Sequence, residues 1–220
     1  MIAGFINWDR IRQYRKKWSY FHPDASESDW NVEFRQLDLR KELYQDRFII
    51  LSDGFYSAVS AAKMGLTEAE WQHLSMQLQL EHESTHYFTR RVFGSMRNNL
   101  LDELMAGYRG IVAAIGHYRA DWFLRLLGLE NPDYHGGRLE KYRGQPPLSA
   151  GAFQVLCDAV KAAAENLERF DTTYAKHLKT PDEQVLILIT LSKLTLLELA
   201  SEQAHILLQK MFKEGLEARG

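Results

Sequence analysis

The feature that most constrains the fold is a long helix predicted from Thr67 to about Phe93. Thr67-x-x-Glu70 is a capping box, in which two side chains satisfy backbone N–H groups at the start of a helix. The helix contains the sequence His82-Glu83-Ser84-Thr85-His86. Because residues four apart lie on one helix face, both imidazoles can reach one metal ion, with a carboxylate beside them. We therefore expect a helix that carries two candidate metal ligands.

Other helix signals follow this stretch and predict a mainly α-helical chain. Residues 128–148 contain Asn-Pro, Gly-Gly and Pro-Pro pairs and are predicted to form a long loop. Thr180-Pro181-x-Glu183 combines a cap, an early proline and a capping-box glutamate. The predicted helices run from Asn98 or Asn99 to about Leu127 with a break near Gly116, from Ser149 to about Leu178, and from Thr180 onward as one long final helix.

The first 66 residues are predicted to be the irregular part of the chain, and residues 67–220 the helical part. Trp8 to Trp18 has a helical pattern, whereas Val32 to Leu39 and Phe48 to Leu51 could form strands. The chain has 220 residues, of which 45% are hydrophobic, enough for one substantial core. We expect a single domain over residues 1–220, a helical bundle with at most a small β-sheet near the N-terminus.

The charge balance argues against several classes of partner. Lys and Arg number 27 against 29 Asp and Glu, and this net charge of −2 gives no electrostatic footprint for nucleic acid or an anionic membrane. The basic residues from Arg10 to Lys17 are expected to form a solvated helix face. The most apolar run, Val185 to Ala200, is too short and too charged to span a bilayer and is interpreted as a core helix. We expect no nucleic-acid or membrane partner.

The use of cysteine and the N-terminal sequence bear on the compartment. A single cysteine, Cys157, excludes an internal disulfide and a cysteine-based zinc site, and it is compatible with a reducing environment. The N-terminal sequence turns polar after Ile6 and so lacks the apolar core of a signal peptide. We therefore expect a cytoplasmic protein.

The two histidines of the predicted helix are expected to point into the protein. With about 100° per residue, His82 shares its face with Leu78 and His86, and Thr89 continues that face. Glu83 lies next to this face, close enough to address a water molecule on a metal ion. The alternative interpretation is that the histidines are hydrogen-bonded core residues and that Glu83 is an ordinary surface glutamate.

A third protein ligand is predicted at Glu103, near the start of the next helix. Small residues follow Glu103 on the same face, so this face can approach a partner helix closely, as a shared ligand site needs. They are Gly107, Gly110 and Ala114. The alternative for Asp102 and Glu103 is that they only complement the helix dipole, as acidic residues in a first turn commonly do.

With His82, His86 and Glu103, the chain resembles the zincin metallopeptidases of the gluzincin type, in which HExxH is followed by a helix bearing a glutamate ligand. The resemblance covers residues 71 to 115. It implies that these three residues bind one zinc ion, that Glu83 is the general base, and that the substrate is a peptide or protein. One position departs from the family pattern, because Gly107 stands where an aspartate often supports a ligand histidine.

The mechanism implied by this resemblance is hydrolysis of a peptide bond. Zinc would polarise the scissile carbonyl and lower the pKa of its bound water, and Glu83 would pass the proton to the leaving amine. A further side chain would stabilise the transition state. The candidates for that role lie in or near the predicted long loop and are His117, Tyr118, Tyr134, His135 and Tyr142.

Two other functions compete with this hypothesis. One is a binding protein that keeps a metal ion only for folding, or binds none. The other is a ferritin-like protein with two iron or manganese ions, which would use two Glu-x-x-His motifs and a glutamate from each of two further helices. That scheme gives no role to His82. Its ligands would be Glu83 with His86, Glu202 with His205, Glu103, and either Glu165 or Glu168.

Three polar residues are predicted to share one stripe of the final helix, namely Glu198, Glu202 and His205. The preferred interpretation is a half-buried polar seam that aligns this apolar helix with its neighbours. The alternative is that Glu202 and His205 lie behind the metal ligands and support them.

Overall fold

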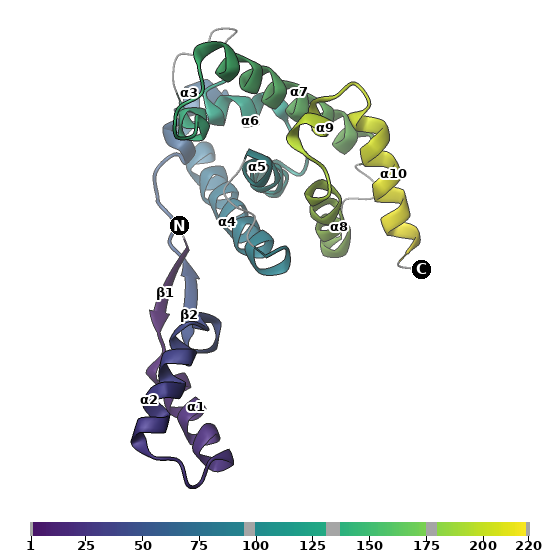
Figure 1. Ribbon diagram of the computed structural model, residues 1–220. Coiled ribbons are helices and arrows are strands. Elements are labelled where there is room, and N and C mark those ends of the chain that lie inside the picture. Colours follow the sequence, from purple (N-terminus) through teal and green to yellow (C-terminus); the bar gives the residue numbers. More distant parts are fainter. Residues whose placement is uncertain (1, 95–99, 131–136, 175–179, 219–220) are drawn as a thin grey trace. The chain divides into compact units, whose positions relative to one another are not determined.

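The computed structural model describes residues 2–94, 100–130, 137–174 and 180–218, and over these residues the chain is mainly α-helical. The described part contains ten α-helices and one two-stranded antiparallel sheet near the N-terminus, which confirms the predicted fold class. The chain forms two compact units, residues 1–50 and 51–220. That the whole chain acts as one domain stays a prediction, and each unit is described by itself (Figure 1).

The first unit pairs two strands and adds two helices. Strands β1 (Ile2–Ile6) and β2 (Gln45–Ile49) are antiparallel, with Ile2 opposite Ile49. The helical pattern from Trp8 is thus confirmed. Of the strand expected from Phe48 to Leu51, only Phe48 and Ile49 lie in β2, which begins earlier, at Gln45. The helical elements are α1 (Trp8–Phe21), α2 (Glu27–Asp38) and the 3₁₀ turn η1 (Lys41–Leu43).

The prediction of a strand from Val32 to Leu39 is wrong, because these residues lie in and just after α2. Ser26 caps this helix and forms a capping box with Asp29. The helix buries Trp30 and Leu37 against Ile11 and Tyr44, which form the small core of this unit. A local capping signal therefore outweighs the alternating pattern of the sequence.

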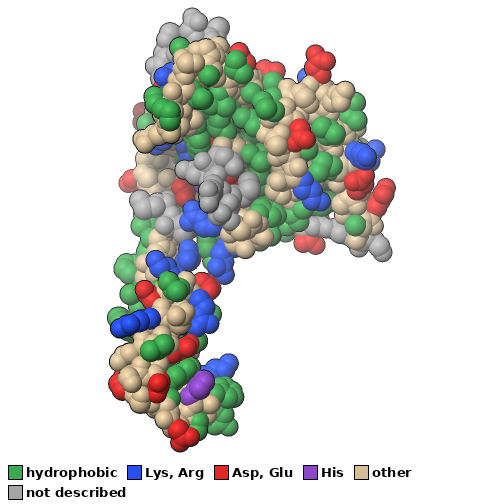
Figure 2. All heavy atoms as spheres, in the orientation of Figure 1, with side chains coloured by type: hydrophobic (Ala, Val, Ile, Leu, Met, Phe, Trp, Pro, Cys, Tyr) green, Lys and Arg blue, Asp and Glu red, His purple; other side chains and the backbone are tan. Residues whose placement is uncertain are grey.

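The basic residues of α1 form a solvated helix face, as predicted. All of them are exposed, and three form ion pairs with acidic neighbours. Arg10 pairs with Asp46 on β2 at 2.8 Å, Arg12 pairs with Asp9, and Arg15 pairs with Glu27. Figure 2 shows acidic and basic side chains interspersed on the visible face of this unit rather than segregated by sign.

The second unit contains the HExxH sequence and is built from helices. Capping boxes form at Thr67 and Thr180 as predicted, and the chain breaks at Gly116, which has a φ of +82°. Asn98, Asn99 and Leu178 lie outside the described residues. The elements are η2 (Tyr56–Ala58), α3 (Ala61–Met64), α4 (Glu68–Val92), α5 (Leu100–Ile115), α6 (Ala120–Leu127), η3 (Arg138–Tyr142), α7 (Ala150–Tyr174), α8 (Pro181–Ser192), α9 (Leu196–Ala200) and α10 (Ala204–Glu217).

The prediction of a single long final helix is wrong, because the three helices α8, α9 and α10 occupy this region. Thr195 and Glu198 form a further capping box that starts α9 after α8 has ended. Glu198 and Glu202 are exposed, and Glu202 lies in the turn before α10, so no continuous stripe joins them to His205. The apolar run from Val185 does contribute buried core residues. Among the described residues, no helix is long and apolar enough to cross a membrane.

Helix α5 is the central element of the second unit and is buried along most of its length. Figure 1 shows α5 between α4 and α8. A Cβ atom on Gly110 would lie 2.8 Å from the carbonyl oxygen of Leu78, so this glycine permits the close approach of α5 to α4. Gly107 instead faces the Phe123 ring of α6, which corrects the expectation that both glycines serve one helix pair.

We expect Gly110→Ala to destabilise the second unit, because the nearest atom to the added methyl group is the backbone carbonyl oxygen of Leu78 on α4, which cannot rotate away as a side chain can. The loss in the free energy of unfolding should be about 1–3 kcal/mol. Gly151→Ala is the matched control, since nothing lies within 4 Å of its Cβ position and alanine favours a helix. Urea unfolding measures both variants. Equal stability of the two would contradict the close contact.

Candidate metal centre

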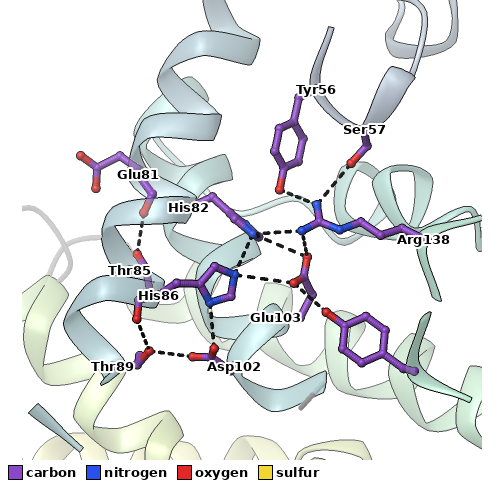
Figure 3. Close-up of polar contacts among 11 residues, drawn as sticks. Tyr56, Ser57, Glu81, His82, Thr85, His86, Thr89, Asp102, Glu103 and Arg138 are labelled. Carbon is purple, nitrogen blue, oxygen red and sulfur yellow. Dashed lines mark hydrogen bonds and ion pairs between the residues drawn. The ribbon is translucent and has the colours of Figure 1, made fainter. Parts of the chain in front are cut away.

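Helices α4 and α5 bring His82, His86 and Glu103 together at one point in the second unit (Figure 3). The two Nε2 atoms of the histidines lie 2.9 Å apart. Glu103 Oε1 lies 3.6 Å from Nε2 of His82, and Glu103 Oε2 lies 3.7 Å from Nε2 of His86. The predicted inward orientation of the histidines is confirmed, because His82 is 1% exposed and the side chain of His86 is 17% exposed.

These three side chains fit a divalent metal ion. Tetrahedral zinc sites with metal–ligand bonds of about 2.0–2.1 Å separate neighbouring ligand atoms by about 3.3 Å, close to the spacing found here. Two imidazoles and one carboxylate are also a donor set that zinc commonly uses, with a position left for another ligand. The chain therefore contains a group that could hold a metal ion, formed by His82, His86 and Glu103.

Asp102 supports one of the candidate ligands, which the sequence did not predict. Its Oδ2 lies 2.8 Å from Nδ1 of His86, and Thr89 donates a hydrogen bond to Oδ1 at 2.7 Å. A carboxylate that accepts a hydrogen bond from Nδ1–H orients the ring so that Nε2 faces the site. The aspartate missing at Gly107 is thus replaced by the residue directly before Glu103, since the first turn of α5 lies against α4.

Arg138 and Tyr142, both on η3, complete the polar surroundings. Nη2 of Arg138 lies 2.8 Å from Oε1 of Glu103 and 3.2 Å from Nε2 of His82. Tyr142 donates a hydrogen bond to Oε2 of Glu103 at 2.9 Å. On its other side Arg138 donates to the hydroxyl of Tyr56 at 2.6 Å, as Figure 3 shows. Both oxygens of Glu103 are therefore held by neighbours.

The surroundings shift the pKa values of these groups in opposite directions. Burial lowers the pKa of His82 to about 3. Burial acts in the same sense on His86, but hydrogen bonds to Asp102 and Glu103 outweigh it and raise that pKa to about 9. Burial acts to raise the pKa of Glu103, yet the hydrogen bond with His86 and the charge of Arg138 hold it well below its usual range. A neutral His82 presents the lone pair that a metal ligand needs.

The two tyrosines and the arginine keep their ordinary charge states. Burial raises the pKa of Tyr56 and of Tyr142, so both phenols stay protonated and can donate. Burial acts to lower the pKa of Arg138, but Tyr56 and Glu103 raise it above its ordinary value. The site thus contains one permanent positive charge in addition to its carboxylates.

Glu83, the predicted general base, follows His82 on α4 and is half-buried. The negative charge of Glu83 contributes to the raised pKa of Tyr56, so Glu83 lies within electrostatic range of the part of the site that Tyr56 occupies. Its role as a base stays a prediction.

The other residues that were predicted to belong to the site lie in different surroundings. Of the candidate transition-state stabilisers, only Tyr142 contacts a candidate ligand within the described residues. His117 is exposed, and Tyr118 is buried against the rings of Tyr108 and Phe123. Tyr134 and His135 lie outside the described residues. Within the same described ranges, neither Glu202 nor His205 shares a hydrogen bond or ion pair with the three candidate ligands.

The dimetal alternative gains no support in the part of the chain that the structure describes. The only group of metal-ligating residues found there is that of His82, His86 and Glu103. Glu165 is exposed, and Glu168 accepts a hydrogen bond from the backbone of Ala120 at 3.1 Å. Helix α7 therefore adds no carboxylate to that group.

Tyr56 and Arg138 could not be recognised as site residues from the sequence, because both lie on short 3₁₀ segments with no motif around them. One local signal accompanies Arg138, namely the preceding glycine. A Cβ atom on Gly137 would lie 2.8 Å from the carbonyl oxygen of Leu127, so only glycine lets η3 start this close to the end of α6.

We expect Asp102→Asn to weaken zinc binding by about 10- to 100-fold, because the amide orients His86 less firmly and polarises it less. Competition with a chromophoric chelator measures the affinity. Asp158→Asn, an exposed substitution on α7, should leave the affinity unchanged. An unaltered affinity in Asp102→Asn would mean that this carboxylate only serves the start of α5.

Comparison with known proteins places the chain in a family. No curated protein and no solved structure matches it. One family profile matches residues 1–203, and its description is "Family of unknown function (DUF7005)". The match covers the whole first unit and, in the second, the three candidate ligands with Asp102 and Arg138. The chain therefore belongs to DUF7005, a family of unknown function.

Proposed function

We propose that the chain is a zinc-dependent peptide hydrolase of the zincin type. The observation that carries the proposal is the convergence of His82 and His86 from α4 with Glu103 from α5, next to Glu83. The support of His86 by Asp102 strengthens it, because carboxylates that orient ligand histidines are typical of zinc sites.

Each residue has a role in this proposal. His82, His86 and Glu103 would hold the ion, which would supply polarisation of the scissile carbonyl and a lower pKa for water. Glu83 would accept a proton from the attacking water and deliver it to the leaving amine. Tyr142 and Arg138 keep the Glu103 carboxylate in place through both of its oxygens.

We expect Glu83→Gln to reduce hydrolysis of casein or a peptide library by about 100- to 10,000-fold, because glutamine cannot accept the proton. Zinc content should remain about one ion per chain, since Glu83 is not a candidate ligand. Turnover and metal analysis are measured on the same preparation.

Glu165→Gln is the control for this experiment, because it makes the same chemical change on an exposed residue of α7. It should leave hydrolysis and zinc content unaltered. If Glu83→Gln keeps full activity with zinc bound, Glu83 is not the general base.

Dialysis against a chelator separates this function from a metal that serves only folding. We expect the helical content by circular dichroism to stay nearly constant while activity is lost. The reason is that α4 and α5 are packed into a large apolar core, apart from the three ligands. A collapse of helicity on chelation would favour the structural-metal alternative.

A further inference from the structure

Arg138 stands out among the side chains around the candidate ligands. Within the described ranges it is the only lysine or arginine with a hydrogen bond or ion pair to any of the three ligands. Its Nη2 contacts Glu103 and His82, the same atoms that a metal ion would use. When a metal ion is bound, the ion and the Arg138 guanidinium therefore share the negative charge of one buried carboxylate, that of Glu103.

This arrangement favours a further negative group at the site. Glu103 is the only carboxylate that forms an ion pair with Arg138 in the described part of the chain. A divalent cation on Glu103 takes up much of that carboxylate's charge, so the guanidinium beside it is less well compensated. An incoming anion restores the balance, and a guanidinium is well suited to bind a carboxylate.

The exposure of Arg138 and the contacts that hold it in place also favour the binding of an anion. The side chain of Arg138 is 26% exposed, whereas those of His82 and Glu103 are 1% and 4% exposed. Of these three side chains, Arg138 therefore presents the most surface to a molecule that arrives from solvent. Tyr56 fixes its other side by accepting a hydrogen bond, and the Tyr56 backbone N–H is anchored to Ser75 of α4 at 3.1 Å.

The segment that holds Arg138 in place has an unusual backbone. Ser57 and Ala58 have φ values of 55° and 56°, in the left-handed region that residues other than glycine seldom adopt. Such residues concentrate at ligand-binding and catalytic sites, where the surrounding structure stabilises them. The hydroxyl oxygen of Ser57 lies 3.4 Å from Nη1 of Arg138. The strained turn therefore lies next to the guanidinium.

We infer that Arg138 binds a carboxylate of the substrate next to the metal ligands, so that the site selects peptides with a carboxylate adjacent to the bond that is cut. This inference rests on the proposed function and names its substrate class. The carboxylate can be the C-terminal one or that of an acidic side chain, since both have the same chemistry.

The test is a calorimetric titration of the zinc-loaded full chain with three small probes. N-benzoylglycine carries a terminal carboxylate, N-benzoylglycinamide is its neutral counterpart, and the α-amide of N-acetylaspartic acid carries only a side-chain carboxylate. The wild type should bind at least one acidic probe about 10-fold or more tightly than the neutral one. Which acid binds identifies the source of the carboxylate.

Variants assign the preference to Arg138. Arg138→Gln should abolish the acid preference, measured on protein whose zinc loading has first been confirmed by metal analysis. Arg138→Lys keeps the charge without the planar fork and should retain only part of the preference. Arg169→Gln, an exposed substitution on α7, controls for the change in net charge. Circular dichroism confirms that each variant is folded.

Three results would overturn the inference. One is a wild type without acid preference, and another is an acid preference that survives in Arg138→Gln. The third is an Arg138→Gln variant that binds zinc more weakly and loses affinity for the acidic and the neutral probes equally. That result would make Arg138 only a positioning residue for Glu103. Failure of the wild type to bind zinc would overturn the proposed function as well, whereas hydrolysis of peptides without acid preference would overturn this inference alone.

Discussion

At Gly110 the backbone of α5 approaches α4 so closely that a methyl group would meet the carbonyl oxygen of Leu78. Leu78 lies one helical turn before His82, and Gly110 lies about two turns after Glu103. The separation of the two helices is therefore fixed near the candidate ligands. With that separation, a glutamate side chain from α5 reaches the imidazoles of α4.

Burial of charge makes this region costly unless every charged group has a partner. Asp102 is paired with His86 and Thr89, and Glu103 with Arg138 and Tyr142. His86 also pairs with Glu103, so the region is one connected network from α4 through α5 to η3. Connected networks of this kind hold their members in one arrangement, which is what an ordered coordination site requires.

The helical part of the site could be predicted from the sequence because its signals are local. The Thr67 capping box and the four-residue spacing of His82 and His86 depend only on helix geometry. The approach of Arg138 could not be predicted in this way. Its position depends on tertiary contacts of a short 3₁₀ segment. The alternating pattern near Val32 indicated a strand for a different reason, because it was given more weight than the local cap at Ser26 that starts a helix there.

The candidate ligands and the side chains around them come from different kinds of structure. The ligands are on two packed helices, whereas Arg138 and Tyr142 are on η3, a turn of five residues. The packing of α4 against α5 does not depend on η3, so a change in η3 alters the groups around Glu103 without altering the spacing of the helix pair. The spacing of the two helices and the polarity around Glu103 are thus set by separate parts of the fold.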